Sequence, residues 1–230
     1  MKIGIMQPYF FPYIGYWQLI QAVDRFVIFD DVNYIKGGWI NRNYVLVGGK
    51  RALITLETRG ASPNQLINAV QVGGNRGKLL KTLTQNYSKA PCYAQNFPLI
   101  RALLEHEECN LAAYLIHIIR EVCKFLNIRA EILVSSDLPK DSTLKGQDKV
   151  ISICQMLGAE WYINAIGGRE LYQPGRFSQS GIQLRFLQSE SVSYRQFGQD
   201  FEPWLSIIDI LMFNPLQTIQ DMLSRYQLVL

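Results

Sequence analysis

The order of apolar and polar positions at the start of the chain predicts a β-α-β unit. Residues 2–6 form a short apolar run that empties into a loop with two prolines, as a buried strand does. Apolar residues recur at helical spacing over 13–23, and a second β-branched and aromatic run covers 26–30. Such a unit has parallel strands and a right-handed crossover, and its ligands lie beyond the carboxyl ends of the strands. The loops at 7–12 and 30–39 are therefore the first candidates for a ligand site.

The middle of the chain has a different pattern. Two short runs flank Gly48 and Gly49, which predicts a β-hairpin with a Gly-Gly turn, and residues 67–72 are expected to add a third strand to it. The alternative for the glycine pair is a phosphate-binding loop. Helical spacing then predicts helices over 78–87, 97–105 and 110–126. Asn110 is the expected N-cap of the last helix, because its side chain can accept a hydrogen bond from a backbone N–H.

The alternation of strands and helices resumes after residue 130. Apolar runs predict strands at 131–134, 161–164 and 183–186, with a helix over 147–157. We expect these strands to share one mostly parallel, Rossmann-like sheet with the two N-terminal strands.

The predicted elements define the domain organisation. The chain is expected to form a single α/β domain over 1–230, with an inserted hairpin-plus-helical segment at about 40–128. Two C-terminal helices are predicted at 202–212 and 215–226. Pro203 and Pro215 are their expected N-terminal starters, because proline suits the first turn of a helix.

Composition excludes several classes of protein. With 230 residues, 48% of them hydrophobic, the chain can bury a full core and is not disordered. The net charge of +4 suits an anionic small-molecule substrate, but no clustered basic run indicates nucleic-acid binding. The 11 Phe, 12 Tyr and 4 Trp contrast with only 18% charged residues. This balance fits a deep aromatic pocket, a homo-oligomer interface or a Tyr-rich core.

Targeting segments and metal sites are not predicted. The first apolar run is too short for a signal peptide and no stretch reaches the roughly 18 apolar residues of a membrane span, so we expect a soluble cytoplasmic protein. The four cysteines contain no C-x-x-C pair, and two histidines cannot complete a zinc site. His117 projects away from the apolar stripe of its helix and is expected to face solvent, and His106 is equally uninformative.

Several segments together resemble the WbqC-like protein family. They are Met6-Gln7-Pro8-Tyr9-Phe10-Phe11-Pro12-Tyr13-Ile14-Gly15-Tyr16, Phe29-Asp30-Asp31-Val32, Trp39-Ile40-Asn41-Arg42-Asn43, Leu157-Gly158-Ala159-Glu160-Trp161-Tyr162 and Gly167-Gly168. The first segment is specific, because Q-P-x-x-x-P-x-x-G-Y after an N-terminal strand is rarely met by accident. The resemblance covers nearly the whole chain. It implies a place in bacterial O-antigen or other surface-glycan biosynthesis, and it indicates a pathway rather than a reaction.

The loop after the first predicted strand carries candidate substrate-binding residues. A strand, a Pro-containing loop and a glycine near a helix start form an arrangement in which backbone N–H groups bind phosphate. The candidates are Gln7, Tyr9, Tyr13, Gly15 and Tyr16. This stretch is also similar to the phosphate-binding turn of HIGH-type nucleotidylyltransferases, with Tyr16 in the place of a histidine. A phenol cannot supply a cationic donor, so nucleotide binding is expected rather than adenylyl transfer. The alternative role for Gly15 is close packing of helix and sheet.

Two adjacent carboxylates lie at the end of the second predicted strand. Asp30 or Asp31 is a candidate general base on an amino or hydroxyl group, or a holder of a magnesium ion that bridges phosphates. Lys36 is the third candidate catalytic residue, as a clamp on phosphate or carboxylate. Further candidate substrate-binding residues are Tyr34, Trp39, Arg42 and Asn43. The alternative is that the aspartate pair only caps a turn.

A last group of candidates lies in the second half of the chain. Lys145 precedes a predicted helix and can reach an anion at the start of that helix. Asn164, Gly167, Gly168 and Arg169 follow a strand end, where the glycines and the arginine would form an anion nest. The alternatives are a solvated helix start and a plain glycine turn.

These residues lead to one functional hypothesis and one alternative. The hypothesis is a cytoplasmic group transferase, aminoacyl, acyl or nucleotidyl, that acts on a nucleotide-activated or amino sugar with no assigned cofactor. The alternative is a non-catalytic protein that binds or scaffolds a glycan intermediate. Catalysis requires Asp30 or Asp31 to face the same pocket as Gly15 and Gly167. We therefore predict one cleft lined by Gln7, Tyr9, Tyr13, Tyr16, Asp30, Tyr34, Lys36 and Arg42.

Overall fold

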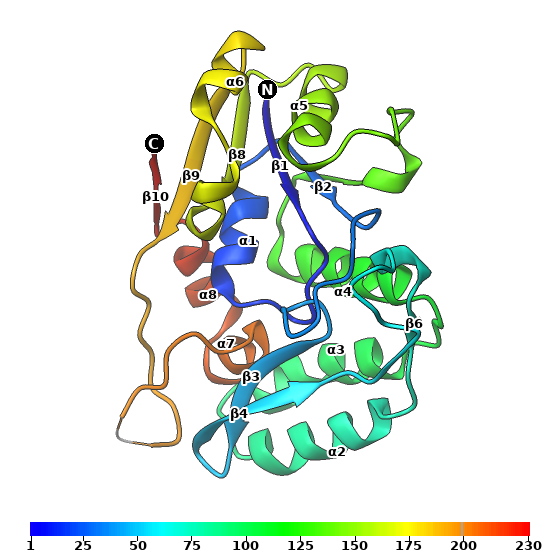
Figure 1. Ribbon diagram of the computed structural model, residues 1–230. Coiled ribbons are helices and arrows are strands. Elements are labelled where there is room, and N and C mark those ends of the chain that lie inside the picture. Colours follow the sequence, from blue (N-terminus) through cyan, green and yellow to red (C-terminus); the bar gives the residue numbers. More distant parts are fainter. Residues whose placement is uncertain (199) are drawn as a thin grey trace.

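A mostly parallel sheet forms the centre of the protein (Figure 1). The computed structural model describes residues 1–198 and 200–230, and over these residues the sheet has six strands in the order β10-β9-β8-β1-β2-β7. The strands are β1 Lys2–Met6, β2 Arg25–Ile28, β7 Glu131–Val134, β8 Trp161–Ala165, β9 Gln183–Ser189 and β10 Tyr226–Val229. Every neighbouring pair is parallel except β10 with β9. The predictions of a mixed α/β fold, of five strands in one sheet and of parallel β1 and β2 are confirmed.

Helices cover both faces of this sheet, and further helices lie beyond the carboxyl end of β1 (Figure 1). They are α1 Ile14–Gln21, α2 Arg76–Tyr87, α3 Tyr93–Glu105, α4 Leu111–Leu126, α5 Gly146–Met156, α6 Pro174–Gln179, α7 Ile207–Phe213 and α8 Leu216–Leu223, with 3-10 turns η1 Ile67–Ala69, η2 Ser135–Asp137 and η3 Ile166–Leu171. Alternate strand residues point to opposite faces. Ile3 and Ile5 therefore join a core with α5 and α6, whereas Phe26 and Ile28 join a larger core with α1, α4 and α8. No described helix has the length and hydrophobicity that a membrane crossing needs.

The segment after β2 forms the predicted hairpin, but its third strand is wrong. The hairpin consists of β3 Arg42–Val47 and β4 Lys50–Thr55, and the turn glycines have φ of 59° and 75°, values that suit glycine. Residues 67–69 instead form η1, because Ile67 N and Asn68 N donate to backbone carbonyls of the loop after β2. Only β6 Gln71–Val72 is extended, and it pairs with β5 Thr58–Arg59 in a separate small sheet. Figure 1 shows the hairpin, α2 and α3 grouped beyond the carboxyl end of β1.

Helix α4 begins as predicted, but one of its side chains lies elsewhere than expected. Asn110 Oδ1 accepts a hydrogen bond from Ala113 N at 3.0 Å, which confirms the N-cap. His117 is half-buried rather than solvent-facing, because it stacks on His106 with ring centroids 3.8 Å apart. The helix thus contributes an imidazole pair as well as its apolar stripe.

The C-terminal region corrects two helix predictions. Helix α7 begins at Ile207, since Ser206 Oγ caps it by accepting from Ile208 N, so Pro203 is not its starter. Helix α8 follows Pro215 as predicted but ends at Leu223, and residues 226–229 form β10. Residues 226–229 form a strand because they pair with β9, and the local sequence pattern contains no information about such a distant partner. Helix α6 was not predicted at all.

Candidate functional site

The strand order of the sheet reverses between β1 and β8. From β1 the chain proceeds to β2 and β7 on one side, and it then returns to β8 and β9 on the other side of β1. Helix α1 packs on one face of the sheet and α5 on the other. A crevice opens outside the carboxyl ends of the strands at such a reversal. Met6 ends β1 and Ala165 ends β8, and both line a cavity at this point.

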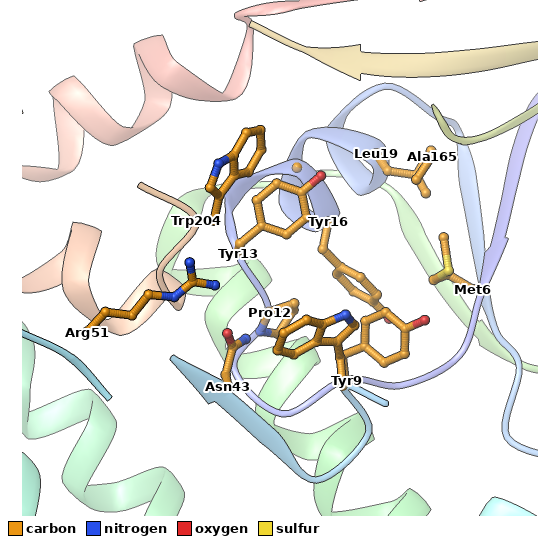
Figure 2. A pocket seen from close by; sticks show the side chains of 12 residues that line it. Met6, Tyr9, Pro12, Tyr13, Tyr16, Leu19, Asn43, Arg51, Ala165 and Trp204 are labelled. Carbon is orange, nitrogen blue, oxygen red and sulfur yellow. The ribbon is translucent and has the colours of Figure 1, made fainter. Parts of the chain in front are cut away.

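This switch-point cavity has a volume of about 200 Å³ and aromatic walls. Its lining residues are Met6, Tyr9, Pro12, Tyr13, Gly15, Tyr16, Leu19, Trp39, Asn43, Arg51, Ala165 and Trp204. Figure 2 shows the rings of Tyr9, Tyr13, Tyr16 and Trp204 around the space. Six of these twelve residues are predicted substrate-binding residues, so the structure brings together much of the loop-to-helix set. Among the described residues that line the cavity, Arg51 is the only one with a formal charge.

Tyr16 lies at the inner end of the cavity. Its hydroxyl donates to the backbone oxygen of Gln7 at 3.0 Å, and its ring lies 5.6 Å from that of Tyr9. Burial, and then the neighbouring Tyr9 and Cys123, raise the pKa of Tyr16 well above its usual value. Burial also raises the pKa of Tyr9. Both side chains are therefore neutral phenols, which can donate hydrogen bonds but cannot act as bases at neutral pH.

Gly15 makes room for the side chain of Tyr13. A Cβ atom at position 15 would lie 2.2 Å from the Tyr13 hydroxyl and 2.7 Å from Ser189 Oγ. Tyr13 in turn contacts Trp204, with ring centroids 5.9 Å apart. The glycine thus allows one aromatic wall of the cavity to lie directly over the first turn of α1.

The loop that carries these tyrosines is held by residues from distant segments. Phe11 is buried with a positive φ of 42°, and its carbonyl accepts from Asn43 Nδ2 at 2.8 Å and Ser206 Oγ at 2.7 Å. Ile207 N donates to the carbonyl of Pro12 at 3.0 Å. Asn43 was predicted to bind substrate, and the structure shows its amide nitrogen engaged with the loop instead.

Arg51 and Trp204 are cavity residues that the sequence analysis missed. The guanidinium of Arg51 lies 3.8 Å from the ring centre of Tyr44, and within residues 1–198 and 200–230 it makes no ion pair. Figure 2 shows it pointing toward the cavity. Trp204 is 63% exposed and has φ of 59°, an uncommon conformation for a bulky residue. No local sequence pattern predicts that the Trp204 side chain is exposed at the cavity. The only sequence feature that points to Arg51 is its position just after the Gly-Gly turn.

The aspartate pair does not share the switch-point cavity. Asp30 is buried and accepts hydrogen bonds from Ser136 N at 3.0 Å and Asn68 Nδ2 at 3.2 Å, at the floor of a different hollow. Asp31 forms ion pairs with Lys140 at 2.8 Å and Lys149 at 3.0 Å. The prediction of one cleft is wrong for these two residues, because the loop after β2 turns toward β7 rather than toward β8.

Burial of the Asp31 carboxyl raises its pKa, but hydrogen bonds from Lys140, Ser135 and Lys149 outweigh that effect. The pKa therefore lies below its usual value. This ionised carboxylate fastens the turn after β2 to the segment around η2 and to α5.

Four other predicted cleft residues also lie outside the cavity, and Gln7 is one of them. Tyr34 is buried and donates to Asn41 Oδ1 at 2.7 Å. Arg42 donates to the carbonyls of Gly37 and Gly38, which closes its own loop. Lys36 is exposed. The structure therefore gives Tyr34 and Arg42 local partners that a pattern of residue types does not disclose, and the catalytic role of Lys36 stays a prediction.

The candidates near β8 lie beside the cavity rather than in its wall. Asn164 donates to the hydroxyls of Tyr162 at 2.7 Å and Tyr172 at 2.9 Å, so its amide is occupied. Gly167, Gly168 and Arg169 are part of η3, which starts directly after Ala165. Lys145 is exposed at the N-terminal end of α5. Their contact with a ligand stays a prediction.

The described residues contain no group of three or more His, Cys, Asp or Glu that could hold a metal ion. The switch-point cavity combines aromatic walls, neutral hydroxyls inside and one guanidinium at its edge. In general, aromatic faces pack against rings and a guanidinium pairs with anionic groups.

The chain is an α/β protein with an aromatic cavity at the switch point of a mostly parallel sheet. The chain belongs to the WbqC-like protein family, which it matches over residues 7–221. It is also similar to the uncharacterized protein Rv1507c of Mycobacterium tuberculosis, with 27% identity over 220 residues that cover 93% of each chain. No solved structure matches the chain.

Proposed function

We propose that this protein is a cytoplasmic group transferase of bacterial O-antigen or surface-polysaccharide biosynthesis that handles a nucleotide-activated sugar. The observation that supports this most directly is Arg51, without an ion pair in the described chain, at the edge of an aromatic cavity. Aromatic faces bind rings, and a guanidinium binds phosphate through a planar fork of donors. The pathway follows from the family resemblance.

The strand order supports a Rossmann-like topology for this proposal. When the parallel strands are counted along the chain, their order across the sheet is 3-2-1-4-5. This is the order of the doubly wound nucleotide-binding folds, in which the ligand lies between the first and fourth strands. The switch-point cavity lies at the ends of those same two strands.

The size of the cavity limits what enters it. Its volume of about 200 Å³ is below the roughly 300–1,000 Å³ of typical ligand sites. One ring therefore enters between Tyr13, Tyr16 and Trp204, and the remainder of the ligand, with its anionic group, stays at the edge beside Arg51. A base or a sugar ring of a nucleotide sugar suits this division.

The test is calorimetric titration of the protein with nucleoside diphosphates and nucleotide sugars. We expect Arg51→Gln to weaken binding roughly 10- to 150-fold, since hydrogen bonds to charged groups contribute about 1.5–3 kcal/mol. Arg101→Gln is the matched control, because Arg101 also lies over an aromatic ring, Phe97, but outside the cavity. Absence of binding by every nucleotide, or equal binding by the Arg51 variant, would contradict the proposal.

A second function, non-catalytic binding of a glycan intermediate, has one observation in its favour. No carboxylate or imidazole lines the switch-point cavity among the residues that the structure describes, and Asp30 lies at another hollow. Turnover separates the two functions. A protein that binds a nucleotide sugar tightly but transfers no group to any acceptor in a reconstituted glycan-precursor assay is a binding protein.

A further inference from the structure

A second polar hollow lies at the same edge of the sheet, beyond the carboxyl ends of β2 and β7. It has a volume of about 620 Å³, within the range of small-molecule sites. We call it the Asp30 hollow, and it is lined by Asp30, Asn68, Asn110, His117, Arg120 and Asp137, among others. The carboxyl ends of parallel strands are where ligands bind in open sheets, so its position suits a ligand.

The floor of this hollow carries a carboxylate without a counter-ion. Asp30 is only 2% exposed, and its two hydrogen-bond donors, Ser136 N and Asn68 Nδ2, are neutral. Within the described chain no Lys, Arg or His nitrogen lies within 4.0 Å of it. Buried charges in proteins are normally paired with an opposite charge or with a metal ion. Asp30 is therefore an exception that calls for a cation.

The adjacent aspartate shows what the usual arrangement looks like. Asp31 has two ammonium groups within 3.0 Å, those of Lys140 and Lys149, and both lysines are buried. Neither lysine forms an ion pair with Asp30. The chain thus gives two cations to Asp31 and none to Asp30, which lines the hollow.

The remaining lining residues indicate what kind of cation fits. Asn68 offers its amide oxygen, since its Nδ2 and both polar atoms of Asn110 already have protein partners. Arg120 offers a guanidinium, and Asp137 and Glu121, the latter paired with Lys124, add two further carboxylates. These groups bind hydroxyls, whereas the aromatic walls of the switch-point cavity are missing among the described lining residues. A ligand that combines an ammonium group with several hydroxyls matches both features.

We infer that the Asp30 hollow is a binding site for an amino sugar, whose ammonium group pairs with the Asp30 carboxylate. The site is separate from the switch-point cavity, so the inference does not depend on the proposed function. The ammonium group of the sugar would supply the counter-ion that Asp30 lacks within the described chain.

The experiment is calorimetric titration with glucosamine, glucose and N-acetylglucosamine, in a buffer acidic enough to keep the free amine protonated. We expect glucosamine to bind at least roughly tenfold more tightly than the two sugars without an ammonium group, because an ion pair with a buried carboxylate is strengthened by the low local dielectric. Three results would overturn the inference: equal affinity for the three sugars, no binding of glucosamine, or binding of Mg²⁺ alone that is as tight as that of glucosamine.

Two variants place the binding at this hollow. Asp30→Asn keeps the shape and removes the charge, and Ala113→Leu adds bulk at the lining of the hollow on a helical position that tolerates leucine. Each is expected to weaken glucosamine binding roughly tenfold or more, and the leucine variant keeps the test open if the asparagine variant does not fold. Asp221→Asn, an exposed carboxylate elsewhere, is the control. Unchanged binding in both hollow variants would refute the site, and Arg51→Gln should leave glucosamine binding intact while it weakens nucleotide binding.

Discussion

Replacement of Asp31 by asparagine tests whether this residue supports the fold or the chemistry. In the structure the Asp31 carboxylate holds the Lys140 and Lys149 ammonium groups at 2.8 and 3.0 Å, and these side chains are 4% and 8% exposed. Loss of the carboxylate leaves two buried cations near each other with no anion between them. Removal of one partner from a buried ion pair costs about 3–5 kcal/mol, so we expect a loss of that size in the free energy of unfolding.

The assay is urea unfolding of the wild type and Asp31→Asn, followed by circular dichroism. A loss of 3–5 kcal/mol corresponds to a fall in Tm of roughly 6–20 °C for a chain of this length. Asp31→Asn combined with Lys140→Met should recover part of the lost stability, since one of the two unpaired cations is then absent. The control is Asp148→Asn, which removes a half-exposed carboxylate whose partner, Arg176, is also half-exposed.

The pH dependence gives a second readout of the same ion pairs. The pKa of Asp31 is lowered in the folded protein, because bonds to Lys140, Ser135 and Lys149 outweigh burial. The unfolded chain takes up this proton first as the pH falls, so the stabilisation is complete above the ordinary aspartate pKa of about 3.9 and is lost progressively as the pH falls from there through the lowered pKa of the folded protein. Asp31→Asn should lack this acid-dependent loss. A variant within 1 kcal/mol of wild type that keeps the wild-type pH profile would refute the structural role.

Three further predictions concern other parts of the molecule. Gly15→Ala should displace the Tyr13 ring, since the new Cβ would lie 2.2 Å from the Tyr13 hydroxyl. We expect at least a roughly tenfold loss of nucleotide affinity and a loss of about 1–3 kcal/mol in the free energy of unfolding. Unchanged affinity would contradict the packing argument. Burial and the neighbouring His106 lower the pKa of His117, so stability should fall as the pH drops below about 6.5, and His117→Gln should flatten that part of a pH-stability curve. Asp209 accepts hydrogen bonds from two tyrosines and a glutamine; Asp209→Asn turns a donor toward one of them and should cost about 1–3 kcal/mol in urea unfolding.

Much of the fold could be predicted because its central strands are buried on both faces. Strands β1, β2 and β8 each have three consecutive buried residues, which is the pattern of a parallel sheet between helix layers. Strand β7, at the sheet edge, is only half-buried but still carries an apolar run, Ile132-Leu133-Val134. Strand β10 could not be predicted in this way. Its residues become a strand only through pairing with β9, a contact that no local pattern encodes.

The candidate site was predictable where one continuous segment builds it. Tyr9, Tyr13 and Tyr16 lie in a single loop and helix, so the position of that loop at the end of β1 places all three in the cavity. Arg51 and Trp204 reach the same cavity from β4 and from the segment before α7. Asp30 failed to join them because its loop turns to Ser136 and Asn68, partners that are set by tertiary packing.

The bond between Ser206 Oγ and the Phe11 carbonyl has a consequence for synthesis of the protein in a cell. These residues are 195 positions apart, and ribosomes add about 5–20 residues per second. The loop that carries the tyrosines therefore leaves the ribosome about 10–40 s before its C-terminal anchor exists. During that interval the nascent chain has no complete switch-point cavity, so a small molecule that binds this cavity cannot assist folding of the nascent chain. Ligand rescue of unstable variants should work only on finished chains.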